Sequence, residues 1–294
     1  MTISAKNPVR FVVLMLAFAV LACIGTGTSE TPEPEPVQEQ EETEPAEPDP
    51  ATQGESDSSA PSDQPVDTQP ASPSTLTPEE IDQVTAASVQ ILATDAALNP
   101  QWTGSGTIIN PTGEIITNCH VACGAPVLLI LMTESADQAP EPRYRAEITH
   151  FDDPLDIAIL QITADVDGNP ISPTDLPFIE VGDSNSLRLG DPIRVFGYPG
   201  VGGSTITFTS GSVSGFESAT VAGTEQRVVV KTDADIASGN SGGTAVNLEG
   251  QLVGIPTLVN PDIRDGVTIG GIGVLRPVNL VDSVRQTGAG QPSV

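Results

Sequence analysis

Residues 235–244 read DIASGNSGGT, and this stretch places Ser241 among three glycines. Such a turn favours a nucleophile, because the backbone must bend sharply to present the hydroxyl and to aim peptide N–H groups at a developing oxyanion. Gly239 can adopt the φ angle that the turn requires, since it has no Cβ atom. Short Gly and Ser clusters also mark ordinary surface turns. The nucleophile therefore has to be judged by whether the chain also supplies a base and an acid.

The base is predicted at His120, one of two histidines in the chain. It follows two strand-like runs that flank a turn at residues 110–113. A histidine at a strand end lies where loops on a rigid scaffold commonly carry chemistry. The other histidine, His150, lies in a more polar stretch, where we expect a solvated or structurally hydrogen-bonded side chain.

The acid is predicted at Asp156, directly before the apolar run Ile-Ala-Ile-Leu at residues 157–160. A carboxylate drawn toward an apolar interior is costly unless a partner such as an imidazole N–H lies there. Asp152 and Asp153 precede a proline and are expected to solvate a turn. The alternative for Asp156 is a cap at the entrance of the strand.

The order His120, Asp156, Ser241 in strand-rich sequence resembles the chymotrypsin-like serine proteases, and the local motifs resemble their HtrA/Deg branch. The resemblance covers about residues 84–287. The segments that carry it are TNCHV at 117–121, DIAIL at 156–160, TDADIASGNSGG at 232–243, VNLEGQLVGI at 246–255 and GIGVLRP at 271–277.

This resemblance implies an all-β fold, a chymotrypsin-like double β-barrel made of two antiparallel six-stranded barrels with the active site in the cleft between them. The first barrel is expected over about residues 81–180 and supplies His120 and Asp156. The second is expected over about residues 181–286 and supplies Ser241.

The resemblance also implies the roles. Ser241 is the nucleophile, His120 the general base and then acid, Asp156 the carboxylate that orients the imidazole, and the amides of Gly239 and Ser241 form the oxyanion hole. The implied enzyme is a serine endopeptidase that hydrolyses unfolded or exposed polypeptides through an acyl-enzyme in cell-envelope quality control, with no cofactor and no metal. Asn240 cannot form an ion pair with a newly cleaved amino terminus, so activation by N-terminal cleavage is not expected. The alternative function is a protease-like peptide-binding or chaperone protein with an inactive resting triad.

Two neighbouring residues bear on the substrate. Asp235 lies six residues before Ser241, where trypsin-like enzymes carry an acid for Lys or Arg side chains. Ile236 stands where the HtrA branch has an apolar residue that helps to shape a pocket for small or aliphatic side chains. The aliphatic preference is favoured over the basic one.

The sequence departs from the family pattern at three further positions. Cys119 and Cys123 flank His120, where the branch usually has no thiol. In an extracytoplasmic protein the pair favours a disulfide, although residues four apart must bend tightly to bring their α-carbons within about 4.4–6.8 Å. Free thiols are the alternative, and two thiols with one occupied histidine make a poor zinc site. Thr244 replaces the usual proline, a change that touches no catalytic atom.

Residues 1–22 are typical of a secretory signal peptide. Lys6 and Arg10 precede an apolar run of twelve residues, and about 20 are needed to span a bilayer. The run ends in Val-Leu-Ala-Cys, which resembles a bacterial lipobox and predicts lipidation of Cys23. The predicted location is therefore extracytoplasmic, anchored as a lipoprotein to the outer face of a bacterial cell membrane, with ordinary secretion or a signal anchor as alternatives.

Composition changes sharply after the signal. Residues 23–78 are rich in Pro, Glu, Asp, Ser and Thr and contain no Lys or Arg, which predicts a disordered, extended tether. Residues 79–288 remain for the protease domain and residues 289–294 form a tail. A helix is expected over residues 77–89, with Thr77 as its cap.

Charge and length narrow the partners. The chain has a formal net charge of −28, and the part after the tether holds 26 acidic residues against 9 Lys and Arg. Nucleic acid and anionic lipid are poor partners for such a surface. HtrA proteins commonly carry a PDZ domain, and this sequence ends at Val294, so none is expected. The expected partners are polypeptide substrates, the membrane through Cys23, and other copies of the chain if it trimerises as relatives often do.

Overall fold

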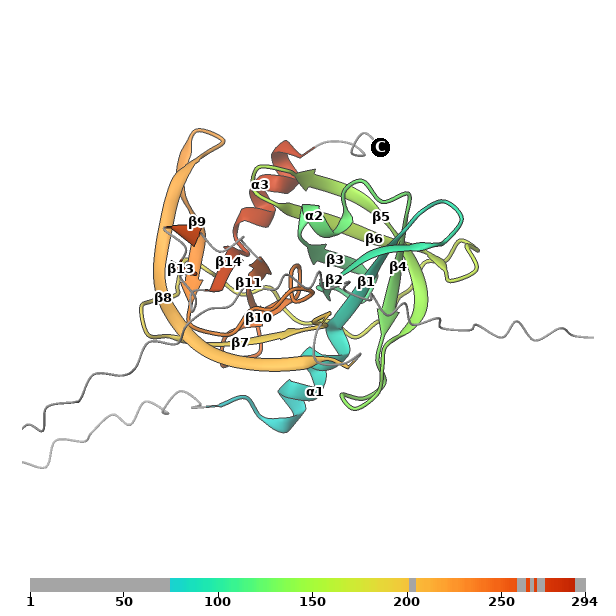
Figure 1. The fold of residues 1–294 in the computed structure, drawn as a ribbon, viewed down its shortest axis with the longest axis horizontal. Helices are drawn as coiled ribbons and strands as arrows, with labels where there is room; N and C mark the ends of the chain where they lie inside the picture. The colour runs from blue at the N-terminus through green and yellow to red at the C-terminus, as the bar shows by residue number, and fades with distance from the viewer. Residues whose placement is uncertain (1–74, 201–204, 258–262, 265–266, 269–272, 289–294) are drawn as a thin grey trace, which may run out of the picture. The chain divides into compact units, whose positions relative to one another are not determined.

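The computed structural model describes residues 75–200, 205–257, 263–264, 267–268 and 273–288. The predicted signal peptide, Cys23, all but the end of the predicted tether, and the tail lie outside these residues. The described part is built mainly from antiparallel strands, with three short helices (Figure 1). No helix in it is long and apolar enough to span a membrane.

The first six strands close into a barrel in the order β1-β2-β3-β6-β5-β4. Its strands turn around an interior that contains Ile91, Ile130 and Leu160. Glycine is required in β2, because a Cβ atom on Gly106 would stand 2.8 Å from Ile115 Cγ2. The strands are β1 (Ser88–Thr94), β2 (Pro100–Ile108), β3 (Glu114–Thr117), β4 (Val127–Met132), β5 (Glu141–Asp152) and β6 (Ile157–Asp165).

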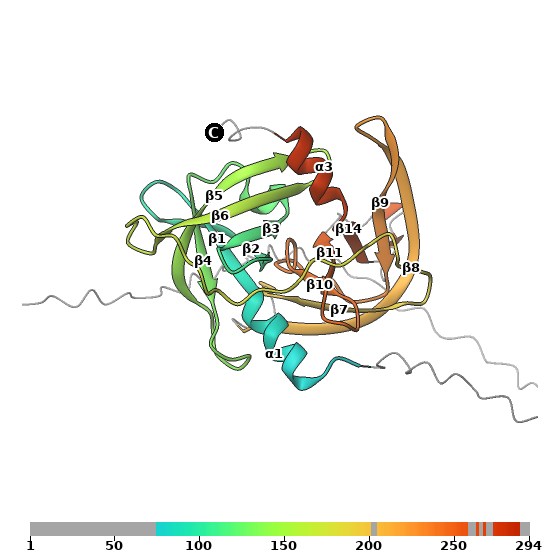
Figure 2. The same ribbon diagram turned by 180° about the vertical axis from the view of Figure 1, so that it is seen from behind.

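The second barrel closes in the order β10-β11-β14-β9-β8-β7. Its interior contains Val195, Val230 and Leu275, and its long strand β8 curves along one side (Figure 2). The prediction of an all-β fold with two six-stranded antiparallel barrels is confirmed. The strands are β7 (Pro192–Gly197), β8 (Thr207–Val221), β9 (Thr224–Thr232), β10 (Thr244–Val246), β11 (Leu252–Thr257) and β14 (Gly273–Pro277), with β12 (Ile263–Arg264) and β13 (Val267–Thr268) as a separate pair.

The three helices come before, among and after the strands along the chain. α1 (Pro78–Ala87) begins with a capping box in which Thr77 and Glu80 exchange side-chain and backbone hydrogen bonds. It ends two residues earlier than the sequence predicts, because Ser88 takes an extended conformation and starts β1. The other helices are α2 (Cys119–Ala122) and α3 (Leu280–Thr287).

A third apolar cluster joins the two barrels. It contains Ile116 and Ile157 from the first barrel, Phe196 and Ile255 from the second, and Val284 of α3. Burial of apolar side chains contributes about 25 cal/mol per Å² removed from water. This shared core therefore holds the end of β3 against the second barrel.

Buried hydroxyl groups cross the same interface. Thr244 Oγ1 lies 2.8 Å from Ser88 Oγ and 2.7 Å from Thr107 Oγ1, and all three residues are fully buried. Buried polar groups need such partners. Proline, the usual residue at this position, has no hydroxyl. Ser88 and Thr107 would each lose the hydrogen bond to Thr244 Oγ1, which gives the departure at Thr244 a physical reason.

Candidate active site

His120 is carried on the single turn of α2, directly after β3. Asn118 caps this turn with extended backbone angles, and the N–H of Val121 donates to its carbonyl at 3.2 Å. The side chain of His120 is 46% exposed. The histidine therefore lies where a rigid strand passes into an accessible turn, three residues beyond the strand end.

His120 and Asp156 are in direct contact. The imidazole Nδ1 lies 2.8 Å from Asp156 Oδ2 and 3.0 Å from Oδ1, and the backbone N–H of His120 donates to Oδ1 at 2.9 Å. A carboxylate can only accept, so the neutral imidazole carries its proton on Nδ1. The other nitrogen, Nε2, is then free of a proton and can act as a base.

Asp156 is held in an unusual backbone conformation. Its φ angle is +55°, and its N–H donates to the carbonyl of Asp153 at 3.0 Å in the turn between β5 and β6. Strained residues of this kind persist where the surroundings fix them, often at functional sites. Asp152 accepts the N–H of Leu155 in the same turn. The turn thus directs only Asp156 toward His120.

Ser241 lies in the loop between β9 and β10 and is 5% exposed. The glycines around it are required by space as well as by angle. Gly239 has a φ angle of +96°, and a Cβ atom there would stand 2.5 Å from the carbonyl oxygen of Tyr198. Gly242 has a φ angle of +81°, and a Cβ atom there would collide with Thr117 Oγ1. No other residue type fits these two positions.

The close approach of Gly242 places the loop of Ser241 against the first barrel. The same added Cβ atom would stand 3.1 Å from the backbone nitrogen of Asn118, two residues before His120. Asn118 Nδ2 also donates to the carbonyl of Asp156 at 2.7 Å and to Thr257 Oγ1 at 2.9 Å. The structure therefore brings the segments of His120, Asp156 and Ser241 together where the two barrels meet.

The peptide units on both sides of Gly239 are fixed. The carbonyl of Ser238 accepts the N–H of Gly200 at 2.9 Å, and the carbonyl of Gly239 accepts Ser105 Oγ at 2.8 Å. In a trans peptide the N–H points opposite to the carbonyl, and the described chain has no cis peptide. The N–H of Gly239 consequently points away from Gly200.

The two predicted pocket residues differ in environment. Asp235 is exposed, and its backbone carbonyl accepts Thr209 Oγ1 at 2.9 Å. Ile236 is half-buried against the core of the second barrel, and its Cδ1 lies 2.8 Å from where a Cβ atom on Gly273 would stand. Ile236 and the start of β14 therefore pack together beside the loop of Ser241.

The structure joins Cys119 and Cys123 in a disulfide, with α-carbons 5.0 Å apart. The bridge closes the turn of α2, in which the N–H of Cys123 donates to the carbonyl of Cys119 at 2.6 Å. The other histidine, His150, lies on β5, with Nδ1 3.2 Å from Thr149 Oγ1. Within the described ranges no cluster of three or more His, Cys, Asp or Glu side chains could hold a metal ion.

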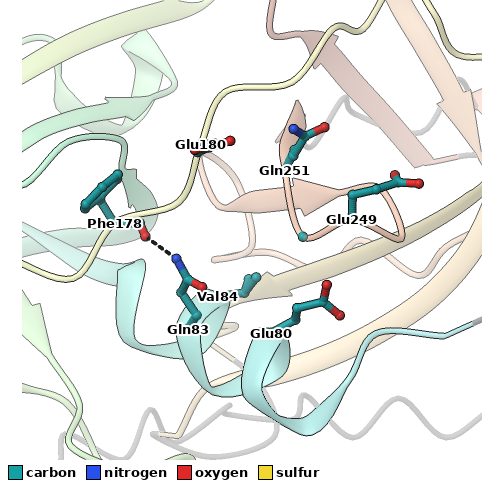
Figure 3. A pocket seen from close by; sticks show the side chains of 8 residues that line it. Glu80, Gln83, Val84, Phe178, Glu180, Glu249 and Gln251 are labelled. Atoms are coloured by element: carbon teal, nitrogen blue, oxygen red, sulfur yellow. Dashed lines mark hydrogen bonds between the residues drawn. The ribbon is translucent and has the colours of Figure 1, made fainter. Parts of the chain in front are cut away.

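A cavity of about 260 Å³ opens between α1 and the turn that connects β10 and β11 (Figure 3). Three glutamates from separate segments, Glu80, Glu180 and Glu249, line it, and Gln83 Nε2 donates to the carbonyl of Phe178 at its edge. None of the three candidate catalytic residues is among its lining residues. The cavity is therefore separate from the candidate active site.

Sequence reasoning assigned no role to Ser105, Asn118 or Thr257. Ser105 contacts the loop of Ser241, and Asn118 contacts both Asp156 and Thr257. Ser105 lies between two glycines at residues 104–106, and Asn118 lies inside the TNCHV segment. A polar residue within each strand-like segment was the only sign of such a role in the sequence. It could not identify the hydrogen-bond partners, which lie more than 35 positions away along the chain.

Comparison with known proteins identifies the family of the chain. Residues 104–255 match the family described as the trypsin-like peptidase domain. The chain is 35% identical over 182 residues to the periplasmic serine endoprotease DegP of Salmonella typhimurium, and 35% identical over 185 residues to the periplasmic pH-dependent serine endoprotease DegQ of Escherichia coli. Each alignment covers 62% of this chain, but only 34% and 36% of the relatives, so the chain spans about a third of their length.

A solved structure of an HtrA-type protease, AlgW with a tripeptide, superposes with a TM-score of 0.54 at 28% identity, covering 71% of this chain and 62% of the other. The chain belongs to the family of trypsin-like peptidase domains. Its relatives DegP and DegQ are the HtrA proteases that the sequence motifs resemble.

Proposed function

We propose that the protein is a serine endopeptidase that cleaves unfolded or exposed polypeptides. The observation that carries the proposal is the 2.8 Å contact between His120 Nδ1 and Asp156 Oδ2, with Nε2 left as the base. The glycine turn of Ser241 packs against the residues that lead into His120. Base, acid and nucleophile therefore come from three separate segments that meet at one place.

The arrangement supports acyl transfer. His120 Nε2 takes the proton of Ser241 Oγ as the oxygen attacks the peptide carbonyl, and Asp156 holds the resulting imidazolium. The N–H groups of Gly239 and Ser241 stabilise the oxyanion of the tetrahedral intermediate. The C–N bond then breaks as His120 returns the proton to the leaving amine. Water attacks the acyl-enzyme by the same steps and releases the acid.

The preferred substrate has a small or aliphatic side chain before the cleaved bond. Ile236 packs against Gly273 and narrows the space beside the nucleophile loop, the segment between β9 and β10 that carries Ser241. Asp235 is exposed, so its carboxylate is already solvated by water. An ion pair between exposed side chains contributes only about 0–1 kcal/mol, so Asp235 would select weakly for Lys or Arg. This contrast favours the aliphatic preference.

The proposed place of action is the cell envelope. The relatives named above are periplasmic endoproteases, and the apolar run before Cys23 is typical of a signal peptide. Lipidation of Cys23 and the acidic tether would hold the catalytic domain outside the membrane, acting in protein quality control. Replacing Cys23 with alanine should release the protein from membrane fractions, and continued retention would contradict the lipid anchor.

A disulfide between Cys119 and Cys123 fits this location, because extracytoplasmic compartments are oxidising. It would lock the single turn of α2, which is too short to be stable by itself. The turn carries His120, so the bridge would keep the base in place.

A fluorophosphonate probe tests the proposal directly, because it reacts only with an activated serine. The full chain should be labelled and should hydrolyse casein, whereas Ser241→Ala should do neither and should unfold at nearly the same temperature. Ser238→Ala, three residues earlier in the same loop, serves as the matched serine control and should keep its labelling. Absence of labelling in the wild type would instead favour a peptide-binding protein with an inactive resting triad.

A further inference from the structure

We propose that Ser105 is a positioning residue that holds the nucleophile loop in its reactive shape from the opposite barrel. The inference rests on the proposed function and deepens it. Ser105 lies on β2 of the first barrel and is fully buried. Ser241 and Gly239, which it contacts, lie in the loop between β9 and β10 of the second barrel.

Ser105 makes four hydrogen bonds to the site. Its N–H donates to the carbonyl of Ser241 at 2.9 Å, and its Oγ donates to the carbonyl of Gly239 at 2.8 Å. The N–H of Tyr198 donates to the same Oγ at 2.9 Å, and Thr117 Oγ1 donates to the carbonyl of Ser105 at 2.7 Å. One residue thus connects the nucleophile loop, the end of β7 and the strand that leads to His120.

The hydroxyl of Ser105 makes the contacts that an apolar side chain could not make. Because Oγ accepts from Tyr198, its own proton is directed at the carbonyl of Gly239. Three glycines make room for this contact: a Cβ atom on Gly197 would stand 3.2 Å from Ser105 Oγ, one on Gly243 would stand 3.2 Å from Ser105 Cβ, and one on Gly242 would collide with its carbonyl oxygen. The packing is built around a serine.

The contact bears on catalysis through Gly239. This residue can rotate freely, since it has no Cβ atom, and its φ angle is +96°. Gly200 fixes the peptide before it and Ser105 fixes the peptide after it. If the second constraint is removed, the peptide between Gly239 and Asn240 can rotate, and the turn that presents the N–H groups of Gly239 and Ser241 to the oxyanion loosens. Loss of one oxyanion donor costs about 10²–10³ in kcat, so partial misalignment should cost about 10- to 100-fold.

The test compares Ser105→Ala with Ser88→Ala. Ser88 is equally buried on the next strand, and its hydroxyl bonds to Thr244 rather than to the nucleophile loop. We expect Ser105→Ala to lower kcat about 10- to 100-fold with KM within about twofold, and Ser88→Ala to keep its kcat. Equal kcat in the two variants would overturn the proposal.

A second pair of Ser105 variants separates the role of the hydroxyl from an effect of misfolding. Ser105→Thr and Ser105→Val have the same shape and differ only in the hydroxyl, so the threonine variant should have the higher kcat. Equal rates in this pair would contradict a role for the hydroxyl.

Hydrogen–deuterium exchange of the peptide that covers residues 235–244 separates this inference from the proposed function. Exchange should quicken in Ser105→Ala and Ser105→Val and stay unchanged in Ser88→Ala, whether or not the wild type is an enzyme. Unchanged exchange in every variant would refute the positioning role of Ser105 without contradicting the proposed triad. An unlabelled wild type with faster exchange in Ser105→Ala would refute only the enzyme.

Discussion

Replacement of Asp156 with asparagine is the sharpest test of how this site orients its base. Asparagine tolerates the left-handed conformation that Asp156 adopts at a φ angle of +55°. The substitution therefore changes the hydrogen bonds and the charge without straining the turn. Alanine would confound the result, since it tolerates this conformation poorly.

The expected magnitude follows from the contacts. Asp156 accepts the backbone N–H of His120 at 2.9 Å and Nδ1 at 2.8 Å. An amide that accepts the backbone N–H turns its NH₂ group toward Nδ1, which must then accept and pass its proton to Nε2. A protonated Nε2 cannot take the proton of Ser241. The same change in the Ser-His-Asp template lowers kcat about 10⁴-fold, about 5.5 kcal/mol at about 1.36 kcal/mol for each tenfold.

The assay is steady-state hydrolysis of a peptide substrate beside thermal unfolding. Asp153→Asn removes a charge from the same turn and should keep kcat within about threefold, because such surface substitutions rarely matter. A kcat for Asp156→Asn within about tenfold of wild type would refute the tautomer argument. Equal losses in both variants would show that charge, rather than orientation, is responsible.

Three further outcomes are expected. Reducing the bridge between Cys119 and Cys123 with dithiothreitol should lower the free energy of unfolding by about 2 kcal/mol and slow hydrolysis, and a Cys119→Ala, Cys123→Ala variant should not respond to the reagent. Burial raises the pKa of Tyr198, so the folded protein keeps a proton that the unfolded chain loses above about pH 10. The free energy of unfolding should be unaffected below that pH and fall above it by up to about 1.4 kcal/mol per pH unit. Chemical unfolding of Tyr198→Phe should show a shallower decline. Ile236→Ala should lower kcat/KM for peptides with a valine before the cleaved bond by about tenfold, whereas a similar loss in Asp235→Asn, or cleavage mainly after Lys and Arg, would contradict the aliphatic preference.

The sequence alone predicted the fold class, through motifs that resemble the HtrA/Deg branch, and the three candidate catalytic residues. It did so because the constraints there are local: Gly239 and Gly242 must adopt positive φ angles in a tight turn, and an acid before a buried strand, as at Asp156, needs a partner. These requirements are expressed in a few neighbouring residues, so short motifs carry them.

Only the tertiary structure decided which groups support the site. Ser105 meets Gly239 across 134 positions, and Asn118 meets Thr257 across 139. Neither contact leaves a local pattern, because a buried serine or asparagine reads the same in sequence whatever its partner is. Closing two barrels against each other creates these contacts, and with them the geometry that the proposed triad needs.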